Sequence, residues 1–227
     1  MLVVVAGAAA CGDRGKASEQ TVQALKQRLQ SKSAPENVRG DEHDARAFAA
    51  ARRFYERRGY QPAWFEGTKP SPAAAELTAA VEGVRADGLD PADYDLGPLA
   101  AARTQSKGLF KRGSLDREQV ADADLRLTAT FLKLASHLLT GRVSPADVDP
   151  HWFGQTRKVD VVDVLDRALG GSGVAASLRQ LVPQHQQYGQ VKQALQSFRE
   201  IERRGGWPAV TSLKLKAGTR SPAVAAI

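Results

Sequence analysis

The sequence has one cysteine in 227 residues and, after residue 11, no apolar run of the length needed to cross a bilayer. A single cysteine can form neither an intramolecular disulfide nor a cysteine-based metal cluster. Because a membrane span takes about 20 consecutive apolar residues, the sequence argues against a protein with several membrane-spanning helices. The composition, 42% apolar and 25% charged, is that of an ordinary globular protein and argues against wholesale disorder. We expect one good-sized domain with a buried core and flanking segments.

The usual signatures of catalytic sites are also missing. The sequence contains no Gly-x-Ser-x-Gly nucleophile motif, no His-Glu-x-x-His metal motif and no glycine-rich phosphate loop. Ser136 and His137 are adjacent, but neighbouring side chains on a helix point about 100° apart and cannot pair directly, so His137 is interpreted as a residue near a helix C-terminus. The four histidines are far apart: His43, His137, His151 and His185. We therefore expect no metal ion and no cofactor, while a carboxylate pair that hydrolyses glycosides stays open, because sequence gives no distances.

The charge balance is basic, with 32 lysines and arginines against 25 acids and a net charge of +7. Such a balance suits nucleic acid, anionic lipid headgroups or an acidic polymer such as the bacterial cell wall. The positive residues are scattered, and no zinc-finger spacing or aromatic RNA-binding motif accompanies them. We predict that the chain does not bind nucleic acid and that most of these charges lie on solvated helix faces.

The first eleven residues form a short apolar run that ends in small residues and the lone Cys11. This is the form of a secretory signal with its cleavage site, and it resembles the lipobox of bacterial lipoproteins, which implies lipidation of Cys11. Two other interpretations stay open: cleavage by an ordinary signal peptidase after Ala10, and a buried N-terminal strand. We predict export to the periplasm or cell envelope, with a lipid anchor on Cys11 as the favoured form.

Helical periodicity dominates the rest of the chain. Residues 12–41 are polar and are interpreted as a tether, although Val22, Leu25 and Leu29 have the spacing of one amphipathic helix. Further on, apolar residues recur at helical spacing over 48–55, 77–84, 127–138, 162–169 and 188–201, each run followed by glycine. Asp122 and Asp124 are interpreted as favourable charges in the first turn of the third helix. We predict an all-α fold, with residues 213–216 as the best candidate strand.

Aromatic, proline and glycine residues recur in a fixed order between these predicted helices. Their simplest interpretation is structural: aromatic rings pack in the core or between helices with their polar tips satisfied, and glycines end helices. The motif residues are Tyr60, Trp64, Asp87, Gly88, Tyr94, Gly141, Pro145, Trp152, Pro183, Tyr188, Trp207 and Pro208.

This order resembles the scaffold domain of the large periplasmic murein L,D-transpeptidases, from about residue 47 to residue 210. The resemblance implies an irregular multi-helix scaffold domain over 42–210, after a signal segment over 1–11 and the tether over 12–41. Residues 211–227 resemble the start of a peptidoglycan-binding domain. Members of that family carry their catalytic His and Cys in a Ser-His-Gly-Cys motif, which this sequence lacks. The resemblance therefore implies a non-catalytic portion, either truncated or served by a separately encoded catalytic domain.

Three functions remain in competition. The first is the scaffold portion of an L,D-transpeptidase, a family whose intact members cross-link meso-diaminopimelate residues of the cell wall. The second is a free-standing envelope protein that binds peptidoglycan or a partner protein through its positive surface. The third is a wall hydrolase that uses a carboxylate pair. Peptidoglycan is the expected partner in the first two.

Overall fold

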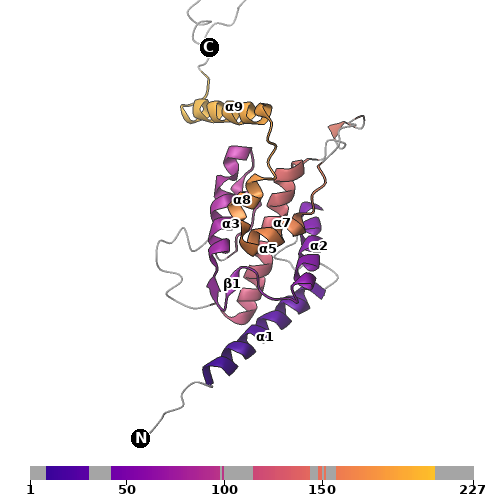
Figure 1. Cartoon of the computed structure of the whole chain (residues 1–227). Coiled ribbons are helices and arrows are strands. Elements are labelled where there is room, and N and C mark those ends of the chain that lie inside the picture. Colours follow the sequence, from indigo (N-terminus) through magenta and orange to yellow (C-terminus); the bar gives the residue numbers. More distant parts are fainter. Residues whose placement is uncertain are drawn as a thin grey trace, which may run out of the picture. The chain divides into compact units, whose positions relative to one another are not determined.

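The computed structural model describes residues 9–30, 42–97, 99, 115–143, 148–149, 151 and 157–207, with the side chains of the first helix described from residue 19. These residues are predominantly helical, and the one sheet among them is a two-stranded antiparallel hairpin, so the all-α prediction is confirmed (Figure 1). The elements are α1 (Ala9–Gln30), α2 (Glu42–Arg57), β1 (Phe65–Glu66), β2 (Lys69–Pro70), α3 (Pro72–Gly83), α5 (Arg117–Thr140), α7 (Val161–Arg167), α8 (Val174–Arg179) and α9 (Gln186–Arg203), with short turns at η2 (Val84–Asp87), η3 (Pro91–Asp93) and η5 (Ala168–Ser172).

The described chain forms two compact units. The first comprises the described residues of 1–85 and 89–183, and the second those of 86–88 and 184–227. All five helices expected from apolar spacing are present, as α2, α3, α5, α7 and α9. The candidate strand at 213–216 lies outside the described residues.

The first unit is built around α5. Its N-terminus has a complete capping box, in which Asp116 and Gln119 each accept the other's backbone N–H. Its C-terminus ends at Gly141, as the sequence predicts, with a φ of 88° that glycine adopts without strain. The apolar stripe includes Leu127, Phe131 and Leu134, all fully buried. Each such side chain contributes about 1.5–3 kcal/mol on burial, so the packing of α1, α2 and α7 on α5 holds the unit together.

Helix α1 occupies part of the segment for which a tether was the favoured interpretation. Leu25 and Leu29 are buried in the core, and Arg28 forms ion pairs with Asp122 at 2.5 Å and Glu118 at 2.8 Å on α5. The spacing of the apolar residues was therefore a better guide here than the polar composition. Residues 31–41 lie outside the described residues, as does the side chain of Cys11.

Short segments from α7 to α8 complete the first unit. Asp160 caps α7 by accepting the Val162 N–H at 2.9 Å. A chain reversal follows at Gly171 (φ 122°) and Gly173 (φ 78°), conformations that favour glycine. The Glu76 carboxylate on α3 then accepts the backbone N–H of Val174 at 2.8 Å, which fixes the start of α8. The sequence did not predict α8 as a separate helix.

The second unit consists of α9 and residues 86–88. Asp87 accepts hydrogen bonds from the Tyr188 hydroxyl at 2.9 Å and the Lys192 ammonium at 2.6 Å, both on α9. Helix α9 has no buried residue within the described structure. Its end at Gly205 and Gly206 agrees with the predicted glycine stop, and both glycines have positive φ. Among all described helices, none combines the length and the hydropathy that a membrane span needs.

Candidate functional site

A buried polar cluster in the first unit is centred on Asp124, on the buried face of α5. Its side chain is fully buried and accepts hydrogen bonds from the Tyr55 hydroxyl at 2.5 Å and from the backbone N–H of Trp64 at 2.7 Å. The Ala63 N–H lies 2.9 and 3.0 Å from its two oxygens. One carboxylate therefore satisfies two backbone donors of the loop after α2 and joins that loop to α5.

Thr128, one turn further along α5, completes this arrangement. Its hydroxyl lies 2.8 Å from the Tyr55 hydroxyl and accepts the Trp64 indole N–H at 2.9 Å. The Trp64 ring also packs against Phe131, with ring centroids 6.2 Å apart. We call Tyr55, Ala63, Trp64, Asp124 and Thr128 the Asp124 cluster. The Trp64 ring is therefore packed on its apolar face and has an acceptor for its N–H, as predicted for a core aromatic residue.

The electrostatics of the Asp124 cluster follow from burial. Loss of hydration raises the pKa of Asp124, against the lowering effect of its three donors, and burial beside this carboxylate raises the pKa of the Tyr55 hydroxyl well above its usual range. Tyr55 therefore stays protonated and donates. Neither residue has any exposed surface. Both groups are therefore closed to solvent in the described structure, and their hydrogen bonds join α2 and the loop after it to α5.

A second polar cluster lies at the C-terminal end of α5. The Tyr94 hydroxyl is 2.8 Å from Nδ1 of the buried His137, and the His43 ring meets the His137 ring edge-on at 4.6 Å. His43 Nε2 is 2.8 Å from the Arg142 carbonyl oxygen, and the Arg142 guanidinium pairs with Asp93 at 2.6 Å. Burial raises the pKa of the Tyr94 hydroxyl, so this tyrosine too remains a neutral hydrogen-bonding group.

Within the described residues, no group of three or more His, Cys, Asp or Glu side chains is arranged to hold a metal ion. His137 does lie near the helix C-terminus, as the sequence indicates, but its contact with His43, 94 residues earlier in the chain, was not predicted.

The other motif residues fall into three groups. The first group lies at the ends of helices or in turns. Tyr60 follows α2, is half-buried and has a φ of 60°, Gly88 has a φ of 79°, and Gly141 ends α5. Asp87 and Tyr188 bond to each other inside the second unit. The half-buried Pro183 is the last residue of the first unit, and Pro145, Trp152 and Pro208 lie outside the described residues.

Trp207 differs from its predicted packing role. Its side chain is 58% exposed, so the interpretation that it packs in a core or between helices does not hold for the described structure. Trp64 and Trp207 therefore have different surroundings in the described structure, because only a ring that faces a neighbouring element is covered.

Sequence reasoning missed three members of the Asp124 cluster: Tyr55 as a hydrogen-bond donor, Thr128, and Asp124 itself. Asp124 was interpreted as a first-turn charge, and its full burial corrects that interpretation. A signal was present, because Asp124, Leu127, Thr128 and Phe131 have the spacing of one helix face. A carboxylate in a buried stripe needs hydrogen-bond partners, and a loop with unpaired N–H groups supplies them.

Comparison with known proteins gives one match. A protein-family model described as "Scaffold domain" matches residues 49–195. No protein of curated function and no solved structure matches the chain. The matched range includes the whole Asp124 cluster, Tyr94 with its partner His137, and the segment from α7 to α8.

Proposed function

This chain belongs to the scaffold-domain family, and from that premise we propose that it is the non-catalytic scaffold portion of a peptidoglycan L,D-transpeptidase, acting in cell-wall cross-linking. The catalytic cysteine would come from outside these 227 residues. The expected partners are peptidoglycan and a separately encoded catalytic domain, and the expected location is the periplasm.

The Asp124 cluster is the observation that supports this proposal. It contains Trp64 from the motif segment after α2, one of the features that resemble the transpeptidase scaffold. Within the described structure its hydrogen bonds join parts of the chain to one another, and its Asp and Tyr have no exposed surface. Such an arrangement serves to hold elements in fixed positions, which is what a scaffold requires.

Depletion of the protein in its source bacterium tests the proposal. We expect muropeptide analysis to show fewer cross-links between diaminopimelate residues after depletion, and wild-type protein to restore them. An Asp124→Ala variant should fail to restore them, because the scaffold would no longer be held together. Asp166→Ala, which removes an exposed acid from α7, is the matched control and should restore them. Unchanged cross-links after depletion would overturn the proposal.

The same muropeptide analysis addresses the wall-hydrolase hypothesis. Purified chain incubated with isolated sacculi should leave the muropeptides unchanged if it is a scaffold. New, smaller muropeptides would instead favour a hydrolase with a carboxylate pair.

The alternative is a free-standing envelope protein that binds peptidoglycan. It is supported by the net charge of +7, because wall carboxylates attract a basic surface. If this is correct, the purified chain should sediment with isolated sacculi at low salt and less at high salt, where surface charges are screened. Sedimentation combined with unchanged cross-links in the depleted strain would favour this alternative over the scaffold.

We also propose that the protein is exported and anchored by a lipid on Cys11. In fractionated cells, wild-type protein should follow the membrane and a Cys11→Ala variant should not. If both versions appear in the soluble periplasmic fraction, ordinary signal cleavage is the better interpretation. If both stay in the cytoplasm, export itself is wrong.

A further inference from the structure

Residues between 157 and 181 line a partly open pocket of about 380 Å³ in the first unit. This lies within the range of about 300–1,000 Å³ that is common for small-molecule sites. Its lining consists of Arg157, Val159, Val164, Arg167, Ser172, Ser177, Gln180 and Leu181. We call it the arginine pocket. Two guanidinium groups line it, and none of its described lining residues is an acid.

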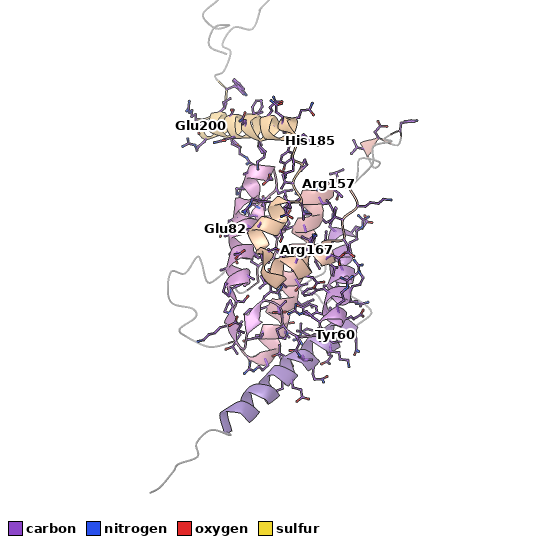
Figure 2. The ribbon with its side chains drawn as sticks, in the orientation of Figure 1. Tyr60, Glu82, Arg157, Arg167, His185 and Glu200 are labelled. Atoms are coloured by element: carbon purple, nitrogen blue, oxygen red, sulfur yellow. The ribbon has the colours of Figure 1, made fainter. Side chains whose placement is uncertain are left out.

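The two arginines, both labelled in Figure 2, are held to different degrees. Arg157, just before α7, donates to the carbonyl oxygens of Leu181 at 2.6 Å and Gln180 at 3.4 Å. Arg167, the last residue of α7, donates only its Nε–H, to the Asp163 carbonyl oxygen at 3.2 Å. Both terminal nitrogens of Arg167 therefore keep their N–H groups available within the described structure.

The nearby acids of α7 do not neutralise Arg167, because α2 engages them. Arg57 pairs with Asp163 at 2.6 Å and with Asp166 at 3.3 Å, and Arg53 pairs with Asp160 at 3.1 Å. No carboxylate among the described residues is paired with Arg157 or Arg167. The pocket consequently carries positive charge that the described protein leaves uncompensated.

The rest of the lining defines what else a ligand needs. Ser172, Ser177 and Gln180 offer hydroxyl and amide groups, which can donate or accept hydrogen bonds. Val164 and Leu181 are buried residues that present an apolar surface. The reversal at Gly171 and Gly173 sets the position of Ser172 relative to α8. A suitable ligand combines an anionic group with a polar backbone and a small aliphatic group.

We infer that the arginine pocket binds the terminal carboxylate of a short aliphatic peptide. The planar fork of Arg167 suits a carboxylate, which it can bind through two parallel N–H···O bonds. Arg157 adds a second positive charge, the hydroxyl groups meet the peptide's backbone, and Val164 and Leu181 contact its methyl group. That the peptide is a stem peptide of the cell wall rests on the proposed function.

Titration of the full chain with N-acetyl-alanyl-alanine tests the inference, followed by calorimetry or by NMR shifts of residues 157–181. The L,L and D,D forms are both used, and the matching C-terminal amide is the ligand control. We expect the carboxylate form to bind at least about tenfold more tightly than the amide, because each charge-assisted hydrogen bond contributes that order of affinity. Equal binding of acid and amide, or no binding of either, would overturn the inference.

Two variants locate the site. Arg167→Gln should weaken binding of the acid about tenfold, and Arg167→Lys, which keeps the charge but loses the fork, should give an intermediate loss. Lys158→Gln removes the same charge from an exposed neighbour outside the lining and should leave affinity unchanged. Equal losses in Arg167→Gln and Lys158→Gln would mean that only net charge matters. Inorganic sulfate that competes as well as the peptide acid would show a general anion site and contradict the peptide assignment.

The outcome can be separated from that of the proposed function. If Arg167→Gln binds the peptide normally while depletion of the chain still lowers cross-linking, the pocket inference fails alone. If the peptide acid binds as expected but depletion leaves cross-links unchanged, the proposed function fails and the pocket stands as a peptide site of another kind.

Discussion

The Asp124 cluster and the arginine pocket both place charged side chains against apolar surroundings, yet they use them in opposite ways. The Asp124 carboxylate is fully buried and accepts two backbone donors and one hydroxyl. In the pocket, Arg167 donates only its Nε–H to the described protein. A buried charge whose partners all come from the chain holds the chain together, whereas a charge with donors to spare can recognise something outside it.

The two sites differ because of what surrounds them in sequence. Asp124 sits in the central stripe of α5, where the loop after α2 brings unpaired N–H groups to it. Arg167 sits at the end of a seven-residue helix, before a reversal made of glycines. The continuous stripe of α5 buries Asp124, whereas the short helices α7 and α8 and the residues that flank them leave the arginine pocket open.

The largest effect should come from Asp124→Ala. The change leaves the N–H groups of Ala63 and Trp64 buried without an acceptor, and we expect it to lower the free energy of unfolding by about 3–4 kcal/mol. Urea denaturation followed by circular dichroism measures it. Asp166→Ala, whose ion pair with Arg57 is exposed, is the control and should cost less than about 1 kcal/mol. Equal urea midpoints for the two variants would show that the buried Asp124 contributes no more to stability than an exposed acid.

The next effect concerns the indole of Trp64. Thr128→Val should cost about 1–3 kcal/mol, because it leaves the buried indole N–H without its acceptor. Trp64→Phe removes that donor, so the double variant should cost less than the sum of the two single variants. A double-mutant cycle in urea gives this coupling. Strict additivity would show that the 2.9 Å contact contributes nothing to stability.

The sequence predicts the helices of the fold better than it predicts the hydrogen-bond partners of the buried polar residues. Apolar spacing correctly indicated five helices, and glycine stops correctly placed the ends of α5 and α9. The same spacing was present in α1, where polar composition led to a tether instead. Helical periodicity is a local property of the chain and can be read directly, whereas the partner of a helix depends on tertiary packing.

The sequence could not show which polar residues pair with one another. Asp124 and Tyr55 are 69 residues apart and meet only because α2 packs on α5. Arg157 and Arg167 were two among 32 basic residues, and nothing in the sequence showed that α2 engages the acids beside one of them. Which charges are paired is decided by the fold, so the arginine pocket becomes visible only in three dimensions.

A smaller effect is expected at Asp160, the N-cap residue of α7. Burial alone would raise the pKa of this carboxyl, but the Val162 N–H and the Arg53 guanidinium outweigh it and hold the pKa below its usual range. Ionised Asp160 therefore stabilises the fold above the unfolded-state pKa of about 3.9, and this contribution is lost as the pH falls through the folded-state pKa. Asp160→Asn keeps a good helix cap and should cost about 0.5–1 kcal/mol at pH 7.

The pH dependence makes the Asp160 prediction specific. The difference between wild type and Asp160→Asn, measured by urea denaturation, should shrink as the pH falls through the lowered folded-state pKa of Asp160 and vanish once its carboxyl is protonated in both the folded and the unfolded state. Asp90→Asn is the matched control, since Asp90 also caps a helical turn but lies 3.4 Å from its partner Arg85. A difference that persists at low pH would assign the effect to the cap and not to the charge.

The smallest effect on stability should be that of Arg167→Gln. This variant tests most directly whether Arg167 serves binding and not the stability of the fold. The variant loses one hydrogen bond to a carbonyl of its own helix, so the free energy of unfolding should change by less than about 0.5 kcal/mol. Its affinity for the peptide acid should nevertheless fall about tenfold. Asp124→Asn should show the reverse, with lower stability and, where it remains folded, unchanged affinity. If Arg167→Gln instead unfolds as readily as Asp124→Ala, Arg167 is a structural residue, and the pocket is closed by the protein's own contacts.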